Sequence, residues 1–265
     1  METSIVVGVG QLGGVFAHGL LKAGQSIVPV RREDSLADLH GEVDPSLVLI
    51  AVGEGDLHGV LPQVPEDWRR RTALIQNELL PGSWSALGDA EPTVAVVWFE
   101  KKAPIAPRVI RSTPIAGPHA ELLVSALASL DISAEVIDAG ALPAALVLKN
   151  LYILTSNVAG RGAPKGATTG HLWTEDRQRT QGIAEDVLTL QKAMLNASGH
   201  AAAAAALDDD ALMRELGETL MADPDHGACG RSAPARHQRA LDQAQTHGLT
   251  LTALAGARVL TEGKS

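Results

Sequence analysis

The chain has 265 residues, 45% of them hydrophobic and 20% charged, a composition typical of a globular protein with a substantial core. Its formal net charge of −9 argues against non-specific binding to nucleic acid, because phosphate backbones need a basic surface. A single cysteine, Cys229, excludes an internal disulfide and a thiolate zinc site and fits a reducing cytoplasm. We expect no signal peptide and no apolar run long enough to cross a membrane.

The first segment of the chain predicts a strand, a turn, a helix and a second strand. Residues 4–7 form a short apolar, β-branched run, as in a buried parallel strand. After the glycine-rich segment 8–14, apolar residues recur at helical spacing up to Gly24, which is typical of a helix C-cap. Residues 26–30 predict the second strand. A G-x-G-x-x-G sequence in this context is the pattern of a dinucleotide-binding turn.

Each glycine of this turn has a physical role in such a site. Gly8 permits the tight turn off the strand, Gly10 lets the backbone approach a pyrophosphate, and Gly13 lets the helix pack closely on the strand. The pyrophosphate is then expected beside Gln11 and Leu12, where the helix N-terminus favours negative charge. The alternative is a glycine-rich turn that holds no ligand.

Two arginines follow the second predicted strand. NAD-binding proteins usually carry an acidic residue there for the ribose 2′-hydroxyl, whereas this chain has Arg31 and Arg32. Two guanidinium groups can form charge-assisted hydrogen bonds with a 2′-phosphate, so the sequence predicts NADP(H) as the cofactor. The alternative is a solvated basic pair that forms salt bridges with Glu33 and Asp34.

Further strands are predicted over 46–52, 72–76, 93–97 and 134–138, with a short helical stretch that ends at residue 60. We therefore expect residues 1–140 to form a Rossmann domain with a doubly wound parallel sheet. Ligands of such sheets lie beyond the carboxyl ends of the strands. This rule adds the following residues to the expected cofactor site: Val52, Gly53, Glu54, Gln76 and Asn77. Asn77 is also a candidate substrate ligand, or an ordinary turn residue.

Residues 141–265 read as helical throughout, which predicts a second, all-helical domain of the kind that brings substrate-binding groups to a nucleotide-binding domain. The expected helices span 141–158, 176–196, 201–207, 211–221, 233–247 and 249–260. The acidic run 208–210 is expected at a helix N-terminus, and 223–226 is expected to be a polar loop and not a metal site.

Lys149 interrupts the apolar run 146–154 in the first of these helices. Lysine is seldom buried without a partner or a function. Lys149, Ile153 and Asn157 share one helix face at i, i+4 and i+8. Partial burial would lower the pKa of Lys149 and suit it to donate a proton to a substrate carbonyl. The alternative is a lysine whose amine reaches the helix surface.

Taken in order, these motifs resemble the ketopantoate reductase family of NADP-dependent 2-oxo acid reductases, within the 6-phosphogluconate dehydrogenase-like superfamily. The matching segments are the turn 8–13, Arg31, residues 75–77, Lys149 with Asn157, and residues 170–172. The resemblance implies that Arg31 holds the NADP phosphate, that residues 76 and 77 lie beside the nicotinamide, and that Lys149 is the catalytic acid. It also implies a 2-oxo acid substrate, a role in pantothenate biosynthesis and a possible homodimer.

Two positions depart from the family pattern. Ile153 stands where the family usually has an asparagine, and Asn150 is turned about a quarter circle away from it. Ala240 stands where the family has a glutamate that contacts the substrate hydroxyl. We therefore expect an NADPH-dependent reductase with Lys149 as general acid, but leave the substrate open. The alternatives are an NADP(H)-binding redox sensor without turnover, or a reductase of an imine or a 3-hydroxy acid.

Overall fold

The computed structural model describes residues 2–102 and 104–257. The chain forms two compact units, Met1–Ala145 and Leu146–Ser265, which are described separately below. The boundary between them lies inside helix α5 (Leu142–Arg161), a few residues after the predicted boundary at 140.

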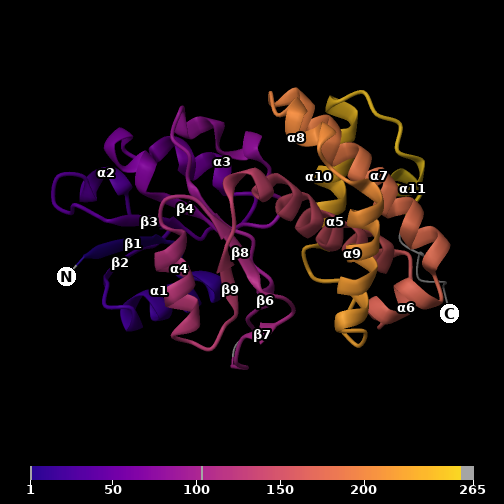
Figure 1. The fold of residues 1–265 in the computed structure, drawn as a ribbon, viewed down its shortest axis with the longest axis horizontal. Helices are drawn as coiled ribbons and strands as arrows, with labels where there is room; N and C mark the ends of the chain where they lie inside the picture. Colours follow the sequence, from indigo (N-terminus) through magenta and orange to yellow (C-terminus); the bar gives the residue numbers. More distant parts are fainter. Residues whose placement is uncertain (1, 103, 258–265) are drawn as a thin grey trace. The chain divides into compact units, whose positions relative to one another are not determined.

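The described part of the first unit contains a seven-stranded sheet in the order β2-β1-β3-β4-β5-β8-β9 (Figure 1). β1 lies between β2 and β3 and pairs with both in parallel register, and β4 and β5 continue the parallel arrangement. This strand order confirms the predicted Rossmann-type sheet. The strands are β1 (Thr3–Val7), β2 (Ser26–Val30), β3 (Leu47–Ile50), β4 (Thr72–Leu74), β5 (Thr93–Ala95), β8 (Thr113–Ala116) and β9 (Ala134–Val136).

The sheet is mostly, not wholly, parallel, because β8 runs antiparallel to β5. A small hairpin of β6 (Phe99–Glu100) and β7 (Arg108–Val109) precedes β8, and neither it nor helix α4 (Ala120–Ala128) was predicted. The predicted strands 46–52, 72–76, 93–97 and 134–138 each end two residues earlier than expected. Ile75 and Val97 explain two of these errors, because both side chains are buried although their backbone has left the strand.

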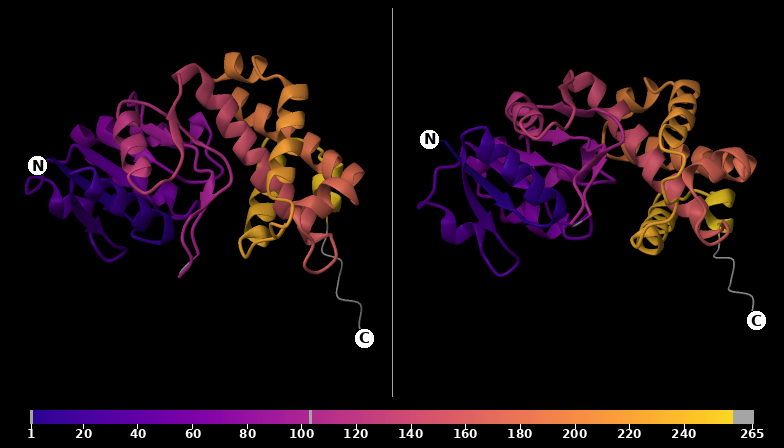
Figure 2. Two further views of the ribbon diagram at one scale, coloured as in Figure 1. Left: turned by 60° about the horizontal axis from the view of Figure 1, so that its bottom comes forward. Right: turned by 90° about the horizontal axis from the view of Figure 1, so that it is seen from below.

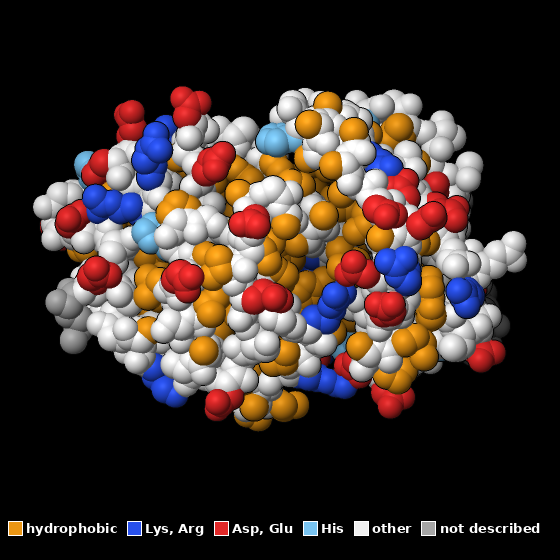
Figure 3. Space-filling model, viewed as in Figure 1, with side chains coloured by type: hydrophobic (Ala, Val, Ile, Leu, Met, Phe, Trp, Pro, Cys, Tyr) orange, Lys and Arg blue, Asp and Glu red, His pale blue; other side chains and the backbone are white. Residues whose placement is uncertain are grey.

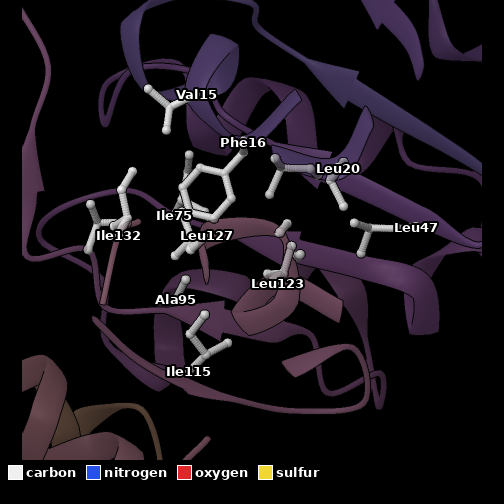
Figure 4. Close-up of a cluster of buried hydrophobic side chains, with 14 of the residues drawn as sticks. Val15, Phe16, Leu20, Leu47, Ile75, Ala95, Ile115, Leu123, Leu127 and Ile132 are labelled. Carbon is white, nitrogen blue, oxygen red and sulfur yellow. The ribbon is translucent and has the colours of Figure 1, made fainter. Parts of the chain in front are cut away.

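Helices cover both faces of this sheet, as a buried parallel sheet requires. α1 (Gln11–Lys22) and α4 pack together on one face, where Phe16, Leu123 and Leu127 meet side chains of the strands (Figure 4). Gly19 permits this approach, since a Cβ there would lie 2.4 Å from the carbonyl oxygen of Ala126. Figure 1 shows α2 (Leu36–Leu39) and α3 (Leu57–Val60) on the opposite side of the sheet from α1 and α4. The chain between α3 and β5 also forms three short 3-10 helices, η1 (Leu61–Gln63), η2 (Glu66–Arg71) and η3 (Pro81–Leu87).

The second unit is helical over its described residues, which confirms that prediction (Figures 1 and 2). α5 is followed by α6 (Thr169–Thr174), α7 (Arg177–Ala197), α8 (Ala201–Ala205), α9 (Asp209–Ala222), α10 (Ala233–Thr246) and α11 (Thr252–Gly256). α6 was not predicted, and residues 258–260 of the predicted helix 249–260 lie outside the described residues. Asp208 caps α9 by accepting a hydrogen bond from Ala211, as the acidic run predicted.

α7 is the central element of this unit and contacts α6, α8, α10 and α11. α5 is joined to α7 by a buried hydrogen bond of 2.7 Å from Asn150 to Gln191. Contrary to the expectation from sequence, one stretch of the described residues, Ala139–Arg161, is long and apolar enough to cross a membrane. Its most apolar window is 61% buried inside the structure, as in the core helix of a globular protein.

Candidate functional site

The glycine-rich turn after β1 has the geometry that a dinucleotide needs. Gly8 has a φ of +88°, which favours glycine, and its N–H donates to Val30 over 2.9 Å. Gly13 lies against this turn so closely that a Cβ would be 2.0 Å from the Gly8 carbonyl oxygen. Gly10 is the N-cap of α1 and offers no side chain to its first turn, and a Cβ there would meet nothing within 4 Å. The start of α1 is therefore open to an anion.

A pocket of about 560 Å³ adjoins this turn and gathers many of the predicted cofactor residues. Its lining includes Gly8, Gly10, Arg31, Arg32, Val52 and Gly53. The Gln11 side chain lines a different pocket beside Gly10, and the Leu12 side chain packs partly against the core. These two residues can therefore offer their backbone N–H groups, and not their side chains, to a ligand in the first pocket. The structure thus brings the turn, the two arginines and the end of β3 together.

Among the described residues, neither arginine side chain forms the salt bridge with Glu33 or Asp34 that the alternative interpretation expects. Arg32 forms a salt bridge of 3.2 Å with Asp56, and both side chains are exposed. Arg31 uses its backbone N–H, which donates to the Asp34 carboxylate over 2.7 Å. Asp34 and Asp56 both line the pocket. A 2′-phosphate would therefore meet two guanidinium groups but would compete with Asp56 for Arg32.

Gln76 and Asn77 follow β4 and do not line this pocket. The Gln76 side chain is buried and donates to the carbonyl oxygens of Ile50 and Val52, at 2.7 and 3.3 Å. It therefore braces the end of β3, next to the pocket. The Asn77 amide donates to Glu54 over 3.1 Å, so Asn77 is oriented by the residue after Gly53. Neither the hydrogen bonds from Gln76 to the end of β3 nor the one from Asn77 to Glu54 was predicted from the sequence.

Lys149 is buried within the helical unit, with 6% of its surface exposed. Its ammonium lies 5.7 Å from the centre of the Tyr152 ring. Burial lowers the pKa of Lys149 to about 7, and the positive charge of Arg236 adds to this effect. Such a lysine can act as a proton donor near neutral pH. Lys149 is therefore not an exposed lysine on the helix surface.

On α5, Lys149 shares a face with Ile153 and Asn157, whereas Arg161, one turn further along, is rotated about 120° from Lys149. Asn157 is buried, donates to the Ile153 carbonyl over 2.8 Å and accepts from the Gly230 N–H at 3.4 Å. Arg161 donates to Nδ1 of His237 over 2.7 Å, while Nε2–H of His237 donates to the Leu254 carbonyl over 2.8 Å.

The elements that meet this face differ from those expected. Ala240, the expected counterpart of a substrate-binding glutamate, fills a core position within α10 and is 1% exposed. The segment that contacts α5 is earlier, at Gly230 and His237, and the positive charge of Arg236 in the same segment acts on Lys149. Neither Arg161 nor Arg236 carries a local sequence signal that marks it as part of this site.

The distribution of charged side chains on the surface agrees with the formal net charge of −9. On the face that Figure 3 shows, acidic and basic side chains are interspersed and form no extended basic surface. Among residues 2–102 and 104–257, no cluster of three or more His, Cys, Asp or Glu side chains is arranged to hold a metal ion.

Solved structures with a similar fold were found, although sequence comparisons found none. Models of protein families and curated protein sequences gave no match. A ketopantoate reductase of the PanE/ApbA family from Ralstonia eutropha JMP134 superposes with a TM-score of 0.63 at 17% identity, covering 97% of this chain and 96% of that one. A dimeric ketopantoate reductase from Staphylococcus aureus gives a TM-score of 0.62 at 15% identity, with 97% and 96% coverage.

D-mandelate dehydrogenase, in a complex with NADH, is also similar, with a TM-score of 0.61 at 11% identity and coverage of 97% and 96%. At these identities the likeness establishes the fold and not the activity. The chain has, over nearly its whole length, the fold of the ketopantoate reductases.

Proposed function

We propose that this protein is an NADPH-dependent reductase of a 2-oxo acid or a closely related carbonyl compound. The observation that carries the proposal is the uncapped start of α1 beside a pocket lined by Arg31 and Arg32. The buried Lys149 of the helical unit supplies the matching acid. The fold shared with ketopantoate reductases supports the assignment.

The residues of the first unit fit the cofactor. Backbone N–H groups at the start of α1, with Gly10 leaving space in front of them, would hold the pyrophosphate. Arg31 and Arg32 would bind the 2′-phosphate, and Val52 and Gly53 would line the adenosine side of the pocket. Asn77 would orient the nicotinamide or the substrate, held by Glu54. NADPH, when bound, supplies the hydride for the carbonyl carbon.

Lys149 would act on the carbonyl oxygen. Its ammonium donates a hydrogen bond to that oxygen and transfers a proton as negative charge develops there. A pKa of about 7 makes this transfer favourable while a large share of the lysine is still protonated at neutral pH. Asn157, which ties α5 to Gly230, would hold the substrate side of the same helix face.

The test is oxidation of NADPH with a panel of 2-oxo acids that includes ketopantoate. We expect turnover with at least one of them, and a loss of about 100-fold or more in kcat for Lys149→Ala, the scale of general acid catalysis. Titration of the protein with NADPH and with NADH measures the preference for the phosphorylated cofactor. Full activity of Lys149→Ala would show that the lysine assignment is wrong.

A second function is favoured by the apolar Ile153 and the core position of Ala240, which provide no polar group to a substrate. A protein that binds NADPH but turns over nothing in the panel would be a redox sensor. Products from an imine or a 3-hydroxy acid would instead identify a reductase of another substrate. A homodimer and a cytoplasmic location remain predictions, and light scattering would test the first.

A further inference from the structure

The segment 228–237 lies along the face of α5 that carries Lys149. Gly160 approaches it so closely that a Cβ would lie 3.0 Å from the backbone of Ala228 and from the Cβ of Cys229. The Gly230 N–H reaches the Asn157 amide at 3.4 Å, and His237 bonds Arg161 at 2.7 Å. These independent contacts fix the start of α10 against α5.

Two hydrogen bonds of His237 connect α10 to Arg161 of α5 and to the Leu254 carbonyl. Because Nε2–H donates to the Leu254 carbonyl, Nδ1 is the acceptor for the Arg161 guanidinium, and the ring is neutral. Its pKa is lowered by burial and, to a smaller degree, by Arg161, which keeps it neutral. Arg236 directly precedes His237 in the sequence, and its positive charge contributes to lowering the pKa of Lys149. The two hydrogen bonds of His237 therefore hold the half-buried Arg236 close enough to α5 for its charge to act on Lys149.

We propose that Arg236 is the residue that binds the substrate carboxylate, next to Lys149 and anchored by the Arg161–His237 pair. The inference rests on the proposed reductase function, since it concerns the substrate of the same site. In this proposal the Arg236 guanidinium of α10 selects acids over neutral carbonyl compounds.

The chemistry of a 2-oxo acid matches this pair of cations. Its carboxylate and its ketone are on neighbouring carbons, so a site for it needs two donors side by side. The guanidinium can hold a carboxylate through two parallel N–H bonds, which a lysine cannot do. The ammonium of Lys149 then takes the ketone oxygen.

Carboxylate binding would also change Lys149. The Arg236 charge depresses the pKa of Lys149 in the free protein, and a bound carboxylate neutralises that charge. The pKa of Lys149 rises when an acid is bound, so the lysine is more fully protonated only in the complex that needs its proton. A neutral carbonyl compound does not produce this effect.

Binding of oxamate, a 2-oxo acid analogue that does not accept hydride, tests the proposal directly. In calorimetric titrations with and without NADPH, Arg236→Gln should bind oxamate about 10- to 100-fold more weakly, as expected for loss of a charge-assisted pair. Arg236→Lys, which keeps the charge without the planar fork, should lie between. Arg231→Gln removes an exposed arginine from the same segment and should change binding less than twofold.

Kinetics give a second readout. Pyruvate and methyl pyruvate share a ketone and differ in the charge of the acid group. Arg236→Gln should reduce the preference for pyruvate about 10-fold or more, through KM, and should move the fall of kcat/KM to higher pH. Unchanged oxamate binding, or an unchanged pyruvate preference, overturns the role of Arg236. If neither compound nor any other 2-oxo acid of the panel leads to oxidation of NADPH, the reductase proposal fails, and the oxamate titration still decides whether Arg236 binds a carboxylate.

Discussion

Three glycines of the opening turn have different surroundings, so alanine at each should give a different result. At Gly13 the new Cβ would stand 2.0 Å from the Gly8 carbonyl oxygen, about 1 Å inside any tolerable contact, and neither backbone can yield easily. Gly8 is held by its hydrogen bond to Val30. α1 must then move away from β1, and we expect Gly13→Ala to lose about 1–3 kcal/mol of unfolding free energy.

The other two glycines have room for a Cβ in the protein itself. Gly10 has a φ of −72° and no atom within 4 Å of the added Cβ, so Gly10→Ala should change stability by less than about 0.5 kcal/mol. The same methyl would occupy the space expected for a pyrophosphate, and the Kd for NADPH should rise about 10-fold or more, or about 1.4 kcal/mol. Gly14→Ala lies within α1, also meets nothing, and should gain up to about 1 kcal/mol with NADPH binding unchanged.

Urea unfolding followed by circular dichroism gives the three stabilities, and NADPH fluorescence gives the three dissociation constants. Gly14→Ala is the matched control, because it adds the same methyl one helical turn from Gly10 on a surface that no pyrophosphate should touch. Wild-type NADPH affinity in Gly10→Ala would refute the assignment of this turn to the cofactor. A fully stable Gly13→Ala would refute the close packing of α1 on the turn.

Three further predictions concern charges and a buried pair. Arg32→Gln should reduce the preference for NADPH over NADH about 10-fold in direct titrations, and Asp56→Asn, which frees Arg32 from its salt bridge, should not reduce it. Lys149→Met should raise the unfolding free energy at pH 6 by about 2–4 kcal/mol, because the buried ammonium is removed. The pKa of Lys149 is lowered from 10.5 to about 7, so between pH 7 and pH 10.5 the unfolded wild-type chain binds more protons than the folded one and the wild-type protein becomes more stable as the pH rises. The stability advantage of Lys149→Met should therefore shrink over this pH range. A difference in urea midpoints that stays constant with pH would contradict the prediction. Asn150→Leu should cost about 1–3 kcal/mol by leaving Gln191 buried without its partner, and a double change to leucine at both positions should recover most of that loss.

The start of the first unit could be predicted well because its signals are local. A β-branched run, glycines at fixed spacing and a second strand are contiguous, and β1, α1 and β2 were found almost to the residue. The ends of the later strands were less predictable. Ile75 and Val97 are as buried as ladder residues, so hydrophobicity continues after the hydrogen-bonded strand has ended.

β8 illustrates a different failure. Its residues, Thr113–Ala116, include Pro114, which normally argues against a strand. The strand lies between β5 and β9, antiparallel to the first and parallel to the second. Sheet direction depends on how the chain returns from the β6–β7 hairpin, and no local propensity encodes that path.

The two halves of the proposed mechanism differ in how they are encoded. Backbone N–H groups bind a pyrophosphate, so the sequence only has to keep side chains out of the way, and glycine at positions 8, 10 and 13 leaves a visible pattern. The face around Lys149 is built from side chains that α5 and α10 bring together from distant parts of the chain. Position 153 can be apolar, as in this chain, or polar, and Arg236 can serve to bind an acidic substrate. Neither change disturbs the fold that positions Lys149. The sequence therefore constrains the proposed cofactor site more narrowly than the proposed substrate site, and variants of the side chains at the start of α10 are the way to test the substrate.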